Sequence, residues 1–482
     1  MALIAPPGAG FPTVGPKAGR AAGSGGAAAL LQQYDRPGPR YTSYPTAVEF
    51  SDQFGEHAYR ERLADAASEV SEPLSLYVHL PFCEARCSYC GCMTIITKKR
   101  EVAARYLGYL EREIAMLSAE LKGRRRLVQY HWGGGTPTYL SAAQIEQLHA
   151  SVVKHFEIDP AGEIAIEVDP RVTTREQLQV LYALGFNRLS LGVQDFTPEV
   201  QAAIGRRQSA ALTRDLYDAA RAIGFKSINL DLIYGLPLQT TDTFNRTLAS
   251  VIAMRPDRIA VYSYAHVPWL RPHQRAIDPA DLPDRTTKFA LIGSAIDAFG
   301  QAGYDAIGMD HFALPADDLA VAARQRRLHR NFMGYTTRRA GDMVGAGVSA
   351  IGDLQGAFAQ NVKKLSAYYD ALDAGRFPID RGYALSADDQ VRRHVITELM
   401  CNFYVNRADT SRRFGVEFDV YFNRELSALA APGGPVDHGF LRIEANGLEV
   451  TDRGRLFVRN ICMPFDKYLP AHDGRPAFSR TI

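Results

Sequence analysis

The chain has 482 residues, of which 46% are hydrophobic and 22% are charged. This composition excludes a disordered or fibrous protein, and no run of about 18 apolar residues is present that could span a membrane. The 55 basic and 53 acidic residues leave a formal charge of +2, which gives no overall field to attract nucleic acid or a membrane surface. We therefore expect a globular protein, with neither nucleic acid nor membrane as a partner.

The first 73 residues lack the patterns of a folded core. Residues 1–33 consist mainly of Ala, Gly and Pro, so we expect a disordered tail. The run AAGSGGAAALL within it could be read as a signal sequence, but its glycines and late position argue against this. Residues 34–73 form an N-terminal arm, and its first part (34–50) shows neither a helical nor a strand period. We expect that part to lie across another domain.

A repeating pattern of strands and helices begins at residue 74. Six short β-branched and aromatic runs are typical of buried parallel strands, and they occupy residues 74–80, 127–132, 163–168, 187–193, 227–233 and 258–264. Between them lie helical stretches whose apolar residues recur at intervals of three and four. Six such units predict an α/β fold in which residues 74–380 form a partial (β/α)6 barrel and its extension.

Chemically unusual residues lie at the same end of each predicted unit. In strand order they are the cysteines, GGGTPT (133–138), Glu167 with Asp169, QDF (194–196), Asp231 and AHVP (265–268). The C-terminal strand ends of a parallel α/β barrel form its active-site face, because the connecting loops converge there. We therefore expect one site that gathers all six groups.

The last hundred residues are predicted to be a mostly helical C-terminal domain. Residues 381–482 end in a short strand pair followed by a helix, a pattern that resembles the end of a winged-helix module. Such modules sometimes bind DNA, but this helix carries no basic stripe. We expect it to pack against the barrel or to act as a lid.

Four of the six cysteines are clustered in FCEARCSYCGC (82–92). A large chain that clusters its thiols in this way indicates a metal or cofactor site in a reducing cytoplasm. Zinc usually takes paired ligands from separated segments, and no second pair is present in the sequence. Cys83, Cys87 and Cys90 could instead hold three irons of a 4Fe-4S cluster and leave the fourth iron open. An open iron implies chemistry rather than electron storage.

The C-x3-C-x2-C spacing after a first strand, with Tyr89 before the third cysteine, resembles the radical S-adenosylmethionine (SAM) family. Further motifs resemble the oxygen-independent coproporphyrinogen III oxidases of haem biosynthesis, and this resemblance covers residues 34–482. The motifs are RYTSYPT (40–46), YVHLPFCEARCSYCGC (77–92), HWGGGTPTYL (131–140), IEVDPR (166–171), NRLSLGVQDF (187–196), DLIYGLP (231–237), GMDHFALP (308–315), LHRNF (328–332) and VRNICM (458–463).

The resemblance implies which residues bind the cofactors, which are one 4Fe-4S cluster and two molecules of SAM. The cluster ligands are Cys83, Cys87 and Cys90. Positions that match contacts of the first SAM are Tyr77, Tyr89, Gly134, Gly135, Thr136, Glu167, Gln194, Arg206 and Asp231. Ala265 and Ile351 match the second SAM site, near which Met333 stands where the family pattern has glutamine. A thioether is a weak hydrogen-bonding group, so we expect weaker polar contacts there.

The residue types suit these roles. Bare glycine backbone can approach the methionyl amine closely, although the same run could simply form a tight turn. Glu167 and Asp231 can accept hydrogen bonds from ribose or amine donors, and Arg206 can bind a carboxylate with two nitrogens. His79 and His131 are compatible with a core position, with support of a ligand or with proton transfer.

The reaction implied by the resemblance is radical oxidative decarboxylation of two propionates of coproporphyrinogen III to vinyl groups, which gives protoporphyrinogen IX. A 5′-deoxyadenosyl radical from SAM removes a hydrogen atom beside the ring, and a low-potential flavodoxin or ferredoxin supplies electrons. We expect a monomer. The tetra-anionic substrate needs local cations. The candidates, each of which could instead be a solvated surface residue, are Lys98, Lys99, Arg100, Arg40 and Arg330.

The other cysteines are predicted not to bind iron. Cys92 follows Cys90 too closely to reach the fourth iron without displacing SAM, so we assign it a catalytic role. Cys401 and Cys462 lie in apolar helical stretches and should be inert. Two other readings are a haem-trafficking protein of the same superfamily and a zinc protein with an unrelated barrel. Cys92 and the RYTSYPT arm argue against the trafficking protein.

Overall fold

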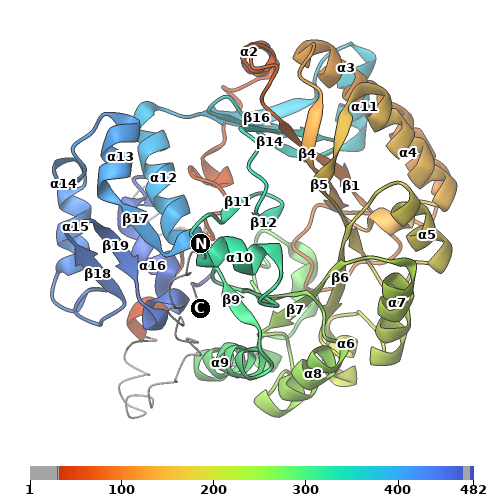
Figure 1. Cartoon of the computed structure of the whole chain (residues 1–482). Coiled ribbons are helices and arrows are strands. Elements are labelled where there is room, and N and C mark those ends of the chain that lie inside the picture. Colours follow the sequence, from red (N-terminus) through yellow and green to blue (C-terminus); the bar gives the residue numbers. More distant parts are fainter. Residues whose placement is uncertain (1–29, 31, 470–477, 482) are drawn as a thin grey trace, which may run out of the picture.

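The protein is described here by a computed structural model that places residues 30, 32–469 and 478–481. Its centre is one curved sheet of twelve strands, which Figure 1 shows edge-on beside a smaller helical part. Six parallel strands occupy the middle of the sheet in chain order, and they are β1 (Leu74–Leu80), β4 (Arg126–Gly134), β5 (Glu157–Val168), β6 (Arg188–Gln194), β7 (Ser227–Tyr234) and β8 (Arg258–Ser263). The predicted α/β fold with a partial (β/α)6 barrel is thereby confirmed.

Strands from later in the chain extend this sheet on both sides. Beyond β1 lie β13 (Asp342–Ala346), β14 (Ile351–Leu354), β15 (Ala357–Asn361) and β16 (Ile379–Ala384), and beyond β8 lie β10 (His311–Ala313) and β9 (Asp305–Ile307). Among these additions, β13 pairs with β1 in parallel, whereas the other pairings are antiparallel. A separate hairpin, β11 (His329–Asn331) with β12 (Gly334–Thr336), follows β10.

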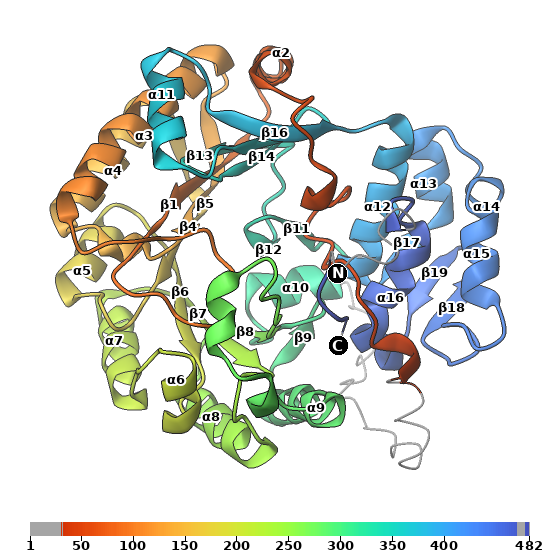
Figure 2. The same cartoon turned by 180° about the vertical axis from the view of Figure 1, so that it is seen from behind.

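Helices cover the outer face of the sheet, as Figures 1 and 2 show. They are α3 (Arg100–Leu121), α4 (Ala142–His155), α5 (Arg175–Ala183), α6 (Pro198–Ala203), α7 (Ala210–Ile223), α8 (Thr241–Met254), α9 (Arg285–Gln301) and α11 (Leu365–Asp373), whereas α10 (Asp318–Arg324) lies in the middle of the molecule against β9. Local signals start several of them. Ser141 with Gln144 and Thr174 with Gln177 form capping boxes at α4 and α5, which satisfy backbone donors that a helix leaves free at its start.

The two faces of the sheet differ in polarity because side chains alternate along each strand. Apolar side chains point outward to the helices and are fully buried, as Trp132 of β4 and Leu230 of β7 illustrate. The strand register puts the polar side chains together on the inner face. In sheet order these are Tyr77, His131, Glu167, Ser190, Asp231, Tyr262 and His311. The inner face therefore holds the side chains that could bind a ligand or react with it.

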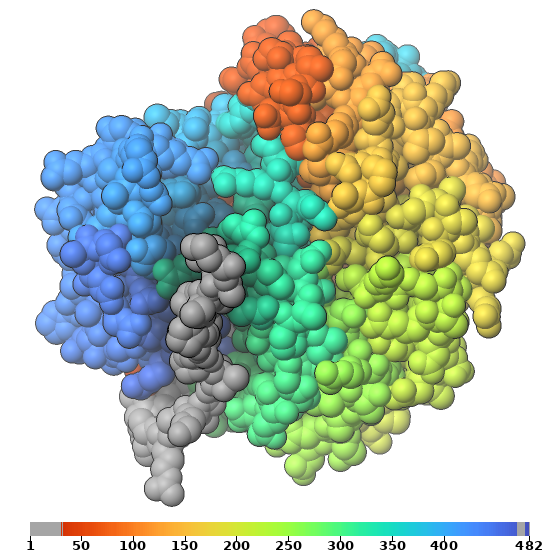
Figure 3. All heavy atoms as spheres, in the orientation of Figure 1, coloured from red at the N-terminus to blue at the C-terminus, as the bar shows by residue number. Residues whose placement is uncertain are grey.

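A second hydrophobic core belongs to the C-terminal part, which Figure 3 shows in blue against the neighbouring part of the barrel. Its helices are α12 (Ala387–Asn402), α13 (Arg407–Phe414), α14 (Phe418–Tyr421), α15 (Asn423–Ala430) and α16 (Val458–Cys462), and its sheet has the order β17 (Tyr404–Asn406), β19 (Gly447–Val450) and β18 (Leu441–Glu444). The pair β18 and β19 followed by α16 matches the predicted strand pair and helix. The winged-helix likeness itself stays a prediction.

The predicted domain boundary at 380/381 falls inside a strand. β16 runs from Ile379 to Ala384 and pairs with β15 of the large sheet. Its Asp, Arg and Gly residues have low strand propensity, which is why the sequence did not indicate it. We propose 384/385 as the boundary instead.

The N-terminal arm joins the two parts. Tyr34, Tyr41 and Tyr44 are buried in the C-terminal core, whereas α2 (Glu56–Ala67) packs on α3 of the barrel. The predicted disordered tail lies outside the described residues, apart from residues 30, 32 and 33. The arm therefore has a fixed course next to the inner face of the sheet.

Arg459 of α16 holds the arm to the other end of the chain. Its buried guanidinium donates to the backbone carbonyls of Gly38, Pro39, Arg480 and Thr481. Burial lowers the pKa of Arg459 to about 9, and the charge of Arg40 adds to this effect. Across the described ranges, no helix is long and apolar enough to cross a bilayer.

Candidate functional site

The cysteine loop, residues 81–99, leaves the C-terminal end of β1. Two short strands in it, β2 (Phe82–Cys83) and β3 (Ile95–Ile96), pair in parallel. All four of its thiols are free, and Cys87 is the most buried of them, whereas Cys92 is exposed. The Cys83 thiol lies 3.3 Å from the hydroxyl of Thr136, and burial raises its pKa to about 11. Thr136 thus lies against the first of the predicted ligands.

Two guanidiniums approach Cys87. Arg171 Nη2 and Arg206 Nη1 lie 3.8 and 4.0 Å from its sulfur, and both arginines pair with the carboxylate of Asp169. Burial alone would raise the pKa of Asp169, but its bonds to Arg171 and the charges of both guanidiniums lower it. Positive charge beside a thiol favours the thiolate, which is the form that binds metal.

Cys90 and Cys92 interact with each other. The pKa of Cys90 is lowered to about 6, chiefly by a hydrogen bond from Cys92 and against the effect of burial, while Arg271 and Arg206 contribute charge. The same bond raises the pKa of Cys92. The proton of this pair therefore stays on Cys92, and Cys90 is the better metal ligand. This division agrees with the predicted roles of the two thiols, which themselves stay predictions.

The donor set fits an iron–sulfur cluster. Three cysteines of one loop offer soft sulfur donors, which iron–sulfur clusters require. Two guanidiniums lie beside the Cys87 sulfur, and the hydrogen bond from Cys92 favours the thiolate of Cys90. Cys83, Cys87 and Cys90 could hold three irons of such a cluster. Cys87 and Cys90 both interact with Tyr89, and the Cys87 sulfur lies 4.0 Å from Arg206. Tyr89 and Arg206 are two of the predicted SAM contacts.

The glycine run at the end of β4 is required by close packing. A Cβ at Gly133 would lie 2.8 Å from the Glu167 carboxylate, and one at Gly135 would lie 2.6 Å from the Pro81 carbonyl. Gly134 has φ +115° and faces the His79 ring, which a Cβ would overlap. The backbone N–H of Gly134 donates to Glu167 over 3.0 Å. The run thus forms a tight turn in which neighbouring groups leave no room for side chains.

Glu167 lies at the centre of the inner face. It accepts from Gly134, and its carboxylate lies 3.7 Å from His131 Nε2. Burial tends to raise its pKa, but the hydrogen bond and charge of His131 lower it. The side chain is nevertheless 44% exposed. The strand register places this exposed surface on the inner face of the sheet, beside His131 and the Gly134 backbone.

Two aromatic groups accompany this carboxylate. Tyr77 stacks on His131 with ring centroids 6.0 Å apart, and its hydroxyl lies 3.0 Å from His79 Nδ1. His79 Nε2 in turn lies 3.1 Å from the carbonyl of Met93 in the cysteine loop. His79 and His131 therefore support neighbouring polar groups, which is one of the roles that the sequence left open.

Strands β6 and β7 contribute the next two predicted residues. Gln194, at the end of β6, has φ +70°, which is uncommon for a residue other than glycine and is often found at functional sites. Asp231 of β7 accepts hydrogen bonds from Ser190 and Asn229. Burial raises the pKa of Asp231 to about 6. Asp231 can therefore exist in both protonation states near neutral pH.

Arg206 makes its hydrogen bonds to other groups of the protein. Its two terminal nitrogens bond to Asp169 and to the carbonyl of Gly192, while the buried Nε has no partner among the described residues. Sequence reasoning expected this guanidinium to bind a ligand carboxylate; it placed Asp169 at the active-site face without a role and did not single out Arg171. Both lie in the IEVDPR motif, which could have pointed to them.

The two residues predicted for the second SAM lie towards opposite edges of the twelve-stranded sheet. Ala265 follows β8, and its carbonyl accepts from the buried Gln274. Ile351 begins β14, beyond β1 and β13. Met333 lies between β11 and β12, where its backbone N–H bonds to Asn331. Whether one ligand spans these positions stays a prediction.

Arg40 and Arg330 meet at the β8 side of the inner face. Arg40 of the arm lies 5.9 Å from the Tyr262 ring and 4.0 Å from Asp310 in the turn between β9 and β10. Arg330 of β11 donates to the carbonyl of Arg40 over 3.0 Å, and its Nε is buried without a partner among the described residues. We call Arg40 and Arg330 the arginine pair.

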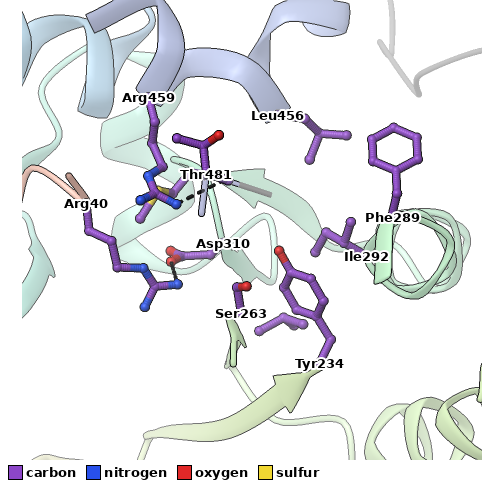
Figure 4. A pocket seen from close by; sticks show the side chains of 11 residues that line it. Arg40, Tyr234, Ser263, Phe289, Ile292, Asp310, Leu456, Arg459 and Thr481 are labelled. Atoms are coloured by element: carbon purple, nitrogen blue, oxygen red, sulfur yellow. Dashed lines mark hydrogen bonds and ion pairs between the residues drawn. The ribbon is translucent and has the colours of Figure 1, made fainter. Parts of the chain in front are cut away.

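Figure 4 shows that Arg40 and Asp310 face a pocket between the barrel and the C-terminal part. Phe289, Ile292 and Leu456 form its apolar wall. Burial would raise the pKa of Asp310, but His311 and the arginine pair lower it to about 2. With Asp310 ionised, the two guanidiniums still leave one positive charge in excess.

The other candidate cations lie elsewhere. Lys98, Lys99 and Arg100 are exposed, and Arg100 bonds to Glu84 and to the carbonyl of Tyr139. Cys401 and Cys462 are buried among apolar residues, as expected. Of the five predicted cations, only the arginine pair adjoins Tyr262 of the inner face.

Comparisons with known proteins place the chain among proteins of known family. Residues 77–251 match the Radical SAM superfamily and residues 385–457 match the HemN C-terminal domain. The oxygen-independent coproporphyrinogen III oxidases of Escherichia coli and Pseudomonas aeruginosa are 47% and 45% identical, each over 94% of this chain and 98% of the relative. The solved coproporphyrinogen III oxidase (HemN) of E. coli, described as a radical SAM enzyme, superposes with a TM-score of 0.86 at 45% identity, over 92% of this chain and 98% of that one.

Proposed function

This chain belongs to the oxygen-independent coproporphyrinogen III oxidase family of radical SAM enzymes, and we propose that it converts two propionates of coproporphyrinogen III to vinyl groups, giving protoporphyrinogen IX. One observation carries the proposal. The inner face of the sheet has a three-cysteine loop at one side and the arginine pair at the other. A candidate site for an iron–sulfur cluster and a candidate site for an anion thus adjoin the same face of the sheet.

The cysteine side would hold the cofactors of this family, a 4Fe-4S cluster and SAM. When bound, they supply a radical that removes a hydrogen atom from the substrate. Cys83, Cys87 and Cys90 would bind the cluster. Glu167 and Asp231 present carboxylate oxygens from neighbouring strands, and these suit amine or ribose hydroxyl donors. Tyr77, Tyr89, Gly135, Thr136 and Gln194 complete the proposed contacts, with Gly134 positioning Glu167 and Arg206 positioning Asp169.

We also propose two SAM molecules, with Ala265 and Ile351 at the second. Met333 offers that site a thioether, so its affinity should depend on packing more than on hydrogen bonding. The flanking Phe332 ring packs edge-on against Phe358 at 5.7 Å, which supports a fixed apolar wall there. Equilibrium binding of SAM to the reconstituted protein should give a stoichiometry of two. A stoichiometry of one would remove the second site from the proposal.

The arginine pair would hold a propionate that is not decarboxylated. Arg40 makes no hydrogen bond with its side chain among the described residues, and the Nε of Arg330 is unpaired and buried. A carboxylate is the ligand that two adjacent guanidiniums bind best. Before substrate binds, the ionised carboxylate of Asp310 would offset the electrostatic repulsion between the two guanidiniums.

Cys92 would keep a proton at the reacting centre. Its pKa is raised chiefly by the bond to Cys90, so the thiol form persists at neutral pH. The arm would limit access of water to the reacting centre, because Arg459 and three buried tyrosines fix its course. We further propose a cytoplasmic monomer that takes electrons from a low-potential flavodoxin or ferredoxin, with no nucleic acid or membrane as partner.

Anaerobic product analysis tests the function. The protein is reconstituted with iron and sulfide, and then given SAM, a reductant and coproporphyrinogen III. We expect protoporphyrinogen IX and loss of two molecules of carbon dioxide per substrate. Stable haem uptake without conversion would instead support the haem-trafficking alternative, and a colourless, zinc-loaded protein would support the zinc alternative.

A further inference from the structure

The segment that follows β8, residues 265–277, packs directly on the cysteine loop. His273 Nε2 lies 2.7 Å from the carbonyl of Cys90, and Gln274 donates to the carbonyl of Tyr89 over 3.0 Å. Gln274 is fully buried, and its amide oxygen also accepts from the backbone of Val267. Figure 2 shows this segment, in green, beside the orange loop that follows β1. We call residues 265–277 the covering segment.

The tip of the covering segment exposes two large apolar side chains. Trp269 is 48% exposed and Leu270 is 57% exposed. The turn that presents them is fixed from inside, because Leu270 and Arg271 both donate to the carbonyl of Val267. A rigid, adjacent aromatic and aliphatic pair on the surface is typical of the centre of a protein interface. The SAM and substrate groups described above do not use these two residues.

The two segments that meet here, residues 83–100 and 265–277, carry six basic residues and one acid, although the chain as a whole is nearly neutral and three exposed aspartates, Asp278, Asp281 and Asp284, follow the covering segment. Residues 83–100 contain Arg86, Lys98, Lys99 and Arg100 against the single acid Glu84, and the covering segment contains two arginines and no acid. Arg275 is exposed. The nearest acid in sequence, Asp278, is turned to the backbone of Ala280. A partner with a negative surface would therefore be attracted to this face.

We propose that a small acidic electron-carrier protein docks on the covering segment and the adjacent cysteine loop, with Trp269 and Leu270 at the centre of the contact and Arg275 in its rim. The proposal rests on the proposed function, because a cluster that drives SAM cleavage needs a reductant. The reduced carrier loses one electron and the cluster gains it, with no atom transferred. His273 of the covering segment is hydrogen-bonded to the carbonyl of Cys90, which is itself a proposed cluster ligand, so the segment that presents this contact is joined directly to the cluster loop.

The test uses the reconstituted holoenzyme, flavodoxin as carrier, and two charge-introducing variants, Leu270→Glu and Arg275→Glu. Matched controls are Val420→Glu and Lys154→Glu. Val420 is 68% exposed on α14 of the C-terminal part, and Lys154 is exposed in the last turn of α4. Binding of oxidised flavodoxin is measured by titration at several salt concentrations, and turnover is measured with reduced flavodoxin and, separately, with dithionite.

We expect each of the two variants to weaken flavodoxin binding at least tenfold and to slow flavodoxin-driven turnover to a similar extent. Turnover with dithionite, which needs no docking surface, should match the unaltered protein. Both controls should behave as the unaltered protein in all assays. Binding should also weaken as salt rises, because the rim charges are solvent-exposed.

Two results would overturn the proposal. Unchanged flavodoxin binding in both variants would show that the carrier docks elsewhere. Equal loss of turnover with flavodoxin and with dithionite, in folded variants that keep their iron, would assign the covering segment to substrate or SAM binding instead. Absence of turnover in the unaltered protein with either reductant would contradict the proposed function, and the binding titration would still decide the docking surface.

Discussion

The cysteine side and the arginine side of the inner face are built in different ways. The cysteine side comes from one loop and the strand ends next to it, so that Cys83, Thr136 and Glu167 lie at or just beyond the C-terminal ends of β1, β4 and β5, three neighbouring strands of the sheet. The arginine side joins Arg40 to Arg330, which are 290 residues apart. Short-range motifs thus form the reactive centre, and long-range packing forms the part that we assign to substrate recognition.

The largest expected effect concerns iron. Cys83→Ser, Cys87→Ser and Cys90→Ser should each lose the cluster, because each removes one of three thiolates, and turnover should be abolished. Cys92→Ser should keep the cluster and lose activity, because we propose that the Cys92 thiol supplies a proton at the reacting centre and does not bind iron. Iron and sulfide analysis with visible absorbance after anaerobic reconstitution measures this. Loss of the cluster in the Cys92 variant would make it a ligand.

Substitutions on the arginine side should weaken substrate binding and leave the cluster in place. Arg330→Met should leave iron content and SAM cleavage intact while it raises KM for the substrate. Loss of a charged hydrogen bond costs about 1.5–3 kcal/mol, which corresponds to roughly 10–150-fold in KM. Arg412→Met is the control, because this arginine lies on the surface and is 75% exposed. An unchanged KM for Arg330→Met would remove the arginine pair from the substrate site.

Deleting the arm is a less specific test of the same idea. Removal of residues 34–46 would take away three buried tyrosines and two carbonyl partners of Arg459, so the C-terminal part would be destabilised as well. Arg40→Met keeps these contacts and removes only the guanidinium. We expect it to retain the cluster absorbance of the unaltered protein and to raise KM as Arg330→Met does. Normal KM would contradict the role of the arm in binding.

A smaller effect tests the packing under the cysteine side. Gly134→Ala would place a methyl group on the His79 ring at φ +115°, and we expect it to lower the free energy of unfolding by about 2 kcal/mol. Gly108→Ala, in an exposed and unobstructed position of α3, should raise it by roughly 0.5–1 kcal/mol. Chemical denaturation of both variants measures the difference. Equal stabilities would mean that the glycine run is not fixed by packing.

The last effect is a dependence of stability on pH, which arises behind the cysteine side and leaves the chemistry of the site unchanged. Buried Glu113 of α3 accepts hydrogen bonds from Gly347, Asn361 and Tyr368, and burial raises its pKa from 4.5 to about 7. The folded protein therefore binds a proton that the unfolded chain has lost between pH 4.5 and 7. The stability from this proton is complete below pH 4.5 and falls as pH rises to 7, by up to about 3 kcal/mol.

Glu113→Gln isolates this effect. The variant should be less stable at pH 5, because it loses the bond from Asn361, but its stability should change less between pH 5 and 8. Denaturation midpoints of both proteins across this range give the difference. Parallel pH profiles would show that Glu113 does not titrate in the folded protein. Asp310 offers a contrast, because its pKa of about 2 keeps the arginine side unchanged over the same range.

The same contrast explains what the sequence could predict. The six parallel strands and the cysteine loop follow from local patterns, and the observed strands begin and end close to the predicted ones, although β5 starts six residues early at Glu157. Its first half contains Pro160 and Gly162, which disfavour a strand, yet it pairs with β4 across a bulge. Local sequence cannot show pairing of that kind.

The long-range contacts were not predictable. Nothing near residue 342 indicates that β13 pairs with β1, which precedes it by more than 250 residues. The sequence placed Arg40 and Arg330 among five equal candidates, and only the fold separates them from the exposed Lys98 and Lys99. Arg171 was not singled out, because its role depends on a contact with Cys87 that only the fold creates, and Asp169 was placed at the active-site face without its arginine partners. Packing, rather than residue type, decides each of these cases.

The most direct test of the account is anaerobic turnover of Arg40→Met/Arg330→Met, with SAM cleavage and protoporphyrinogen IX measured in the same samples. We predict that the double variant binds its cluster and cleaves SAM as the unaltered protein does, while conversion of coproporphyrinogen III at subsaturating concentration falls by at least tenfold. Conversion at the rate of the unaltered protein would contradict the claim that the cysteine side and the arginine side act together on one substrate.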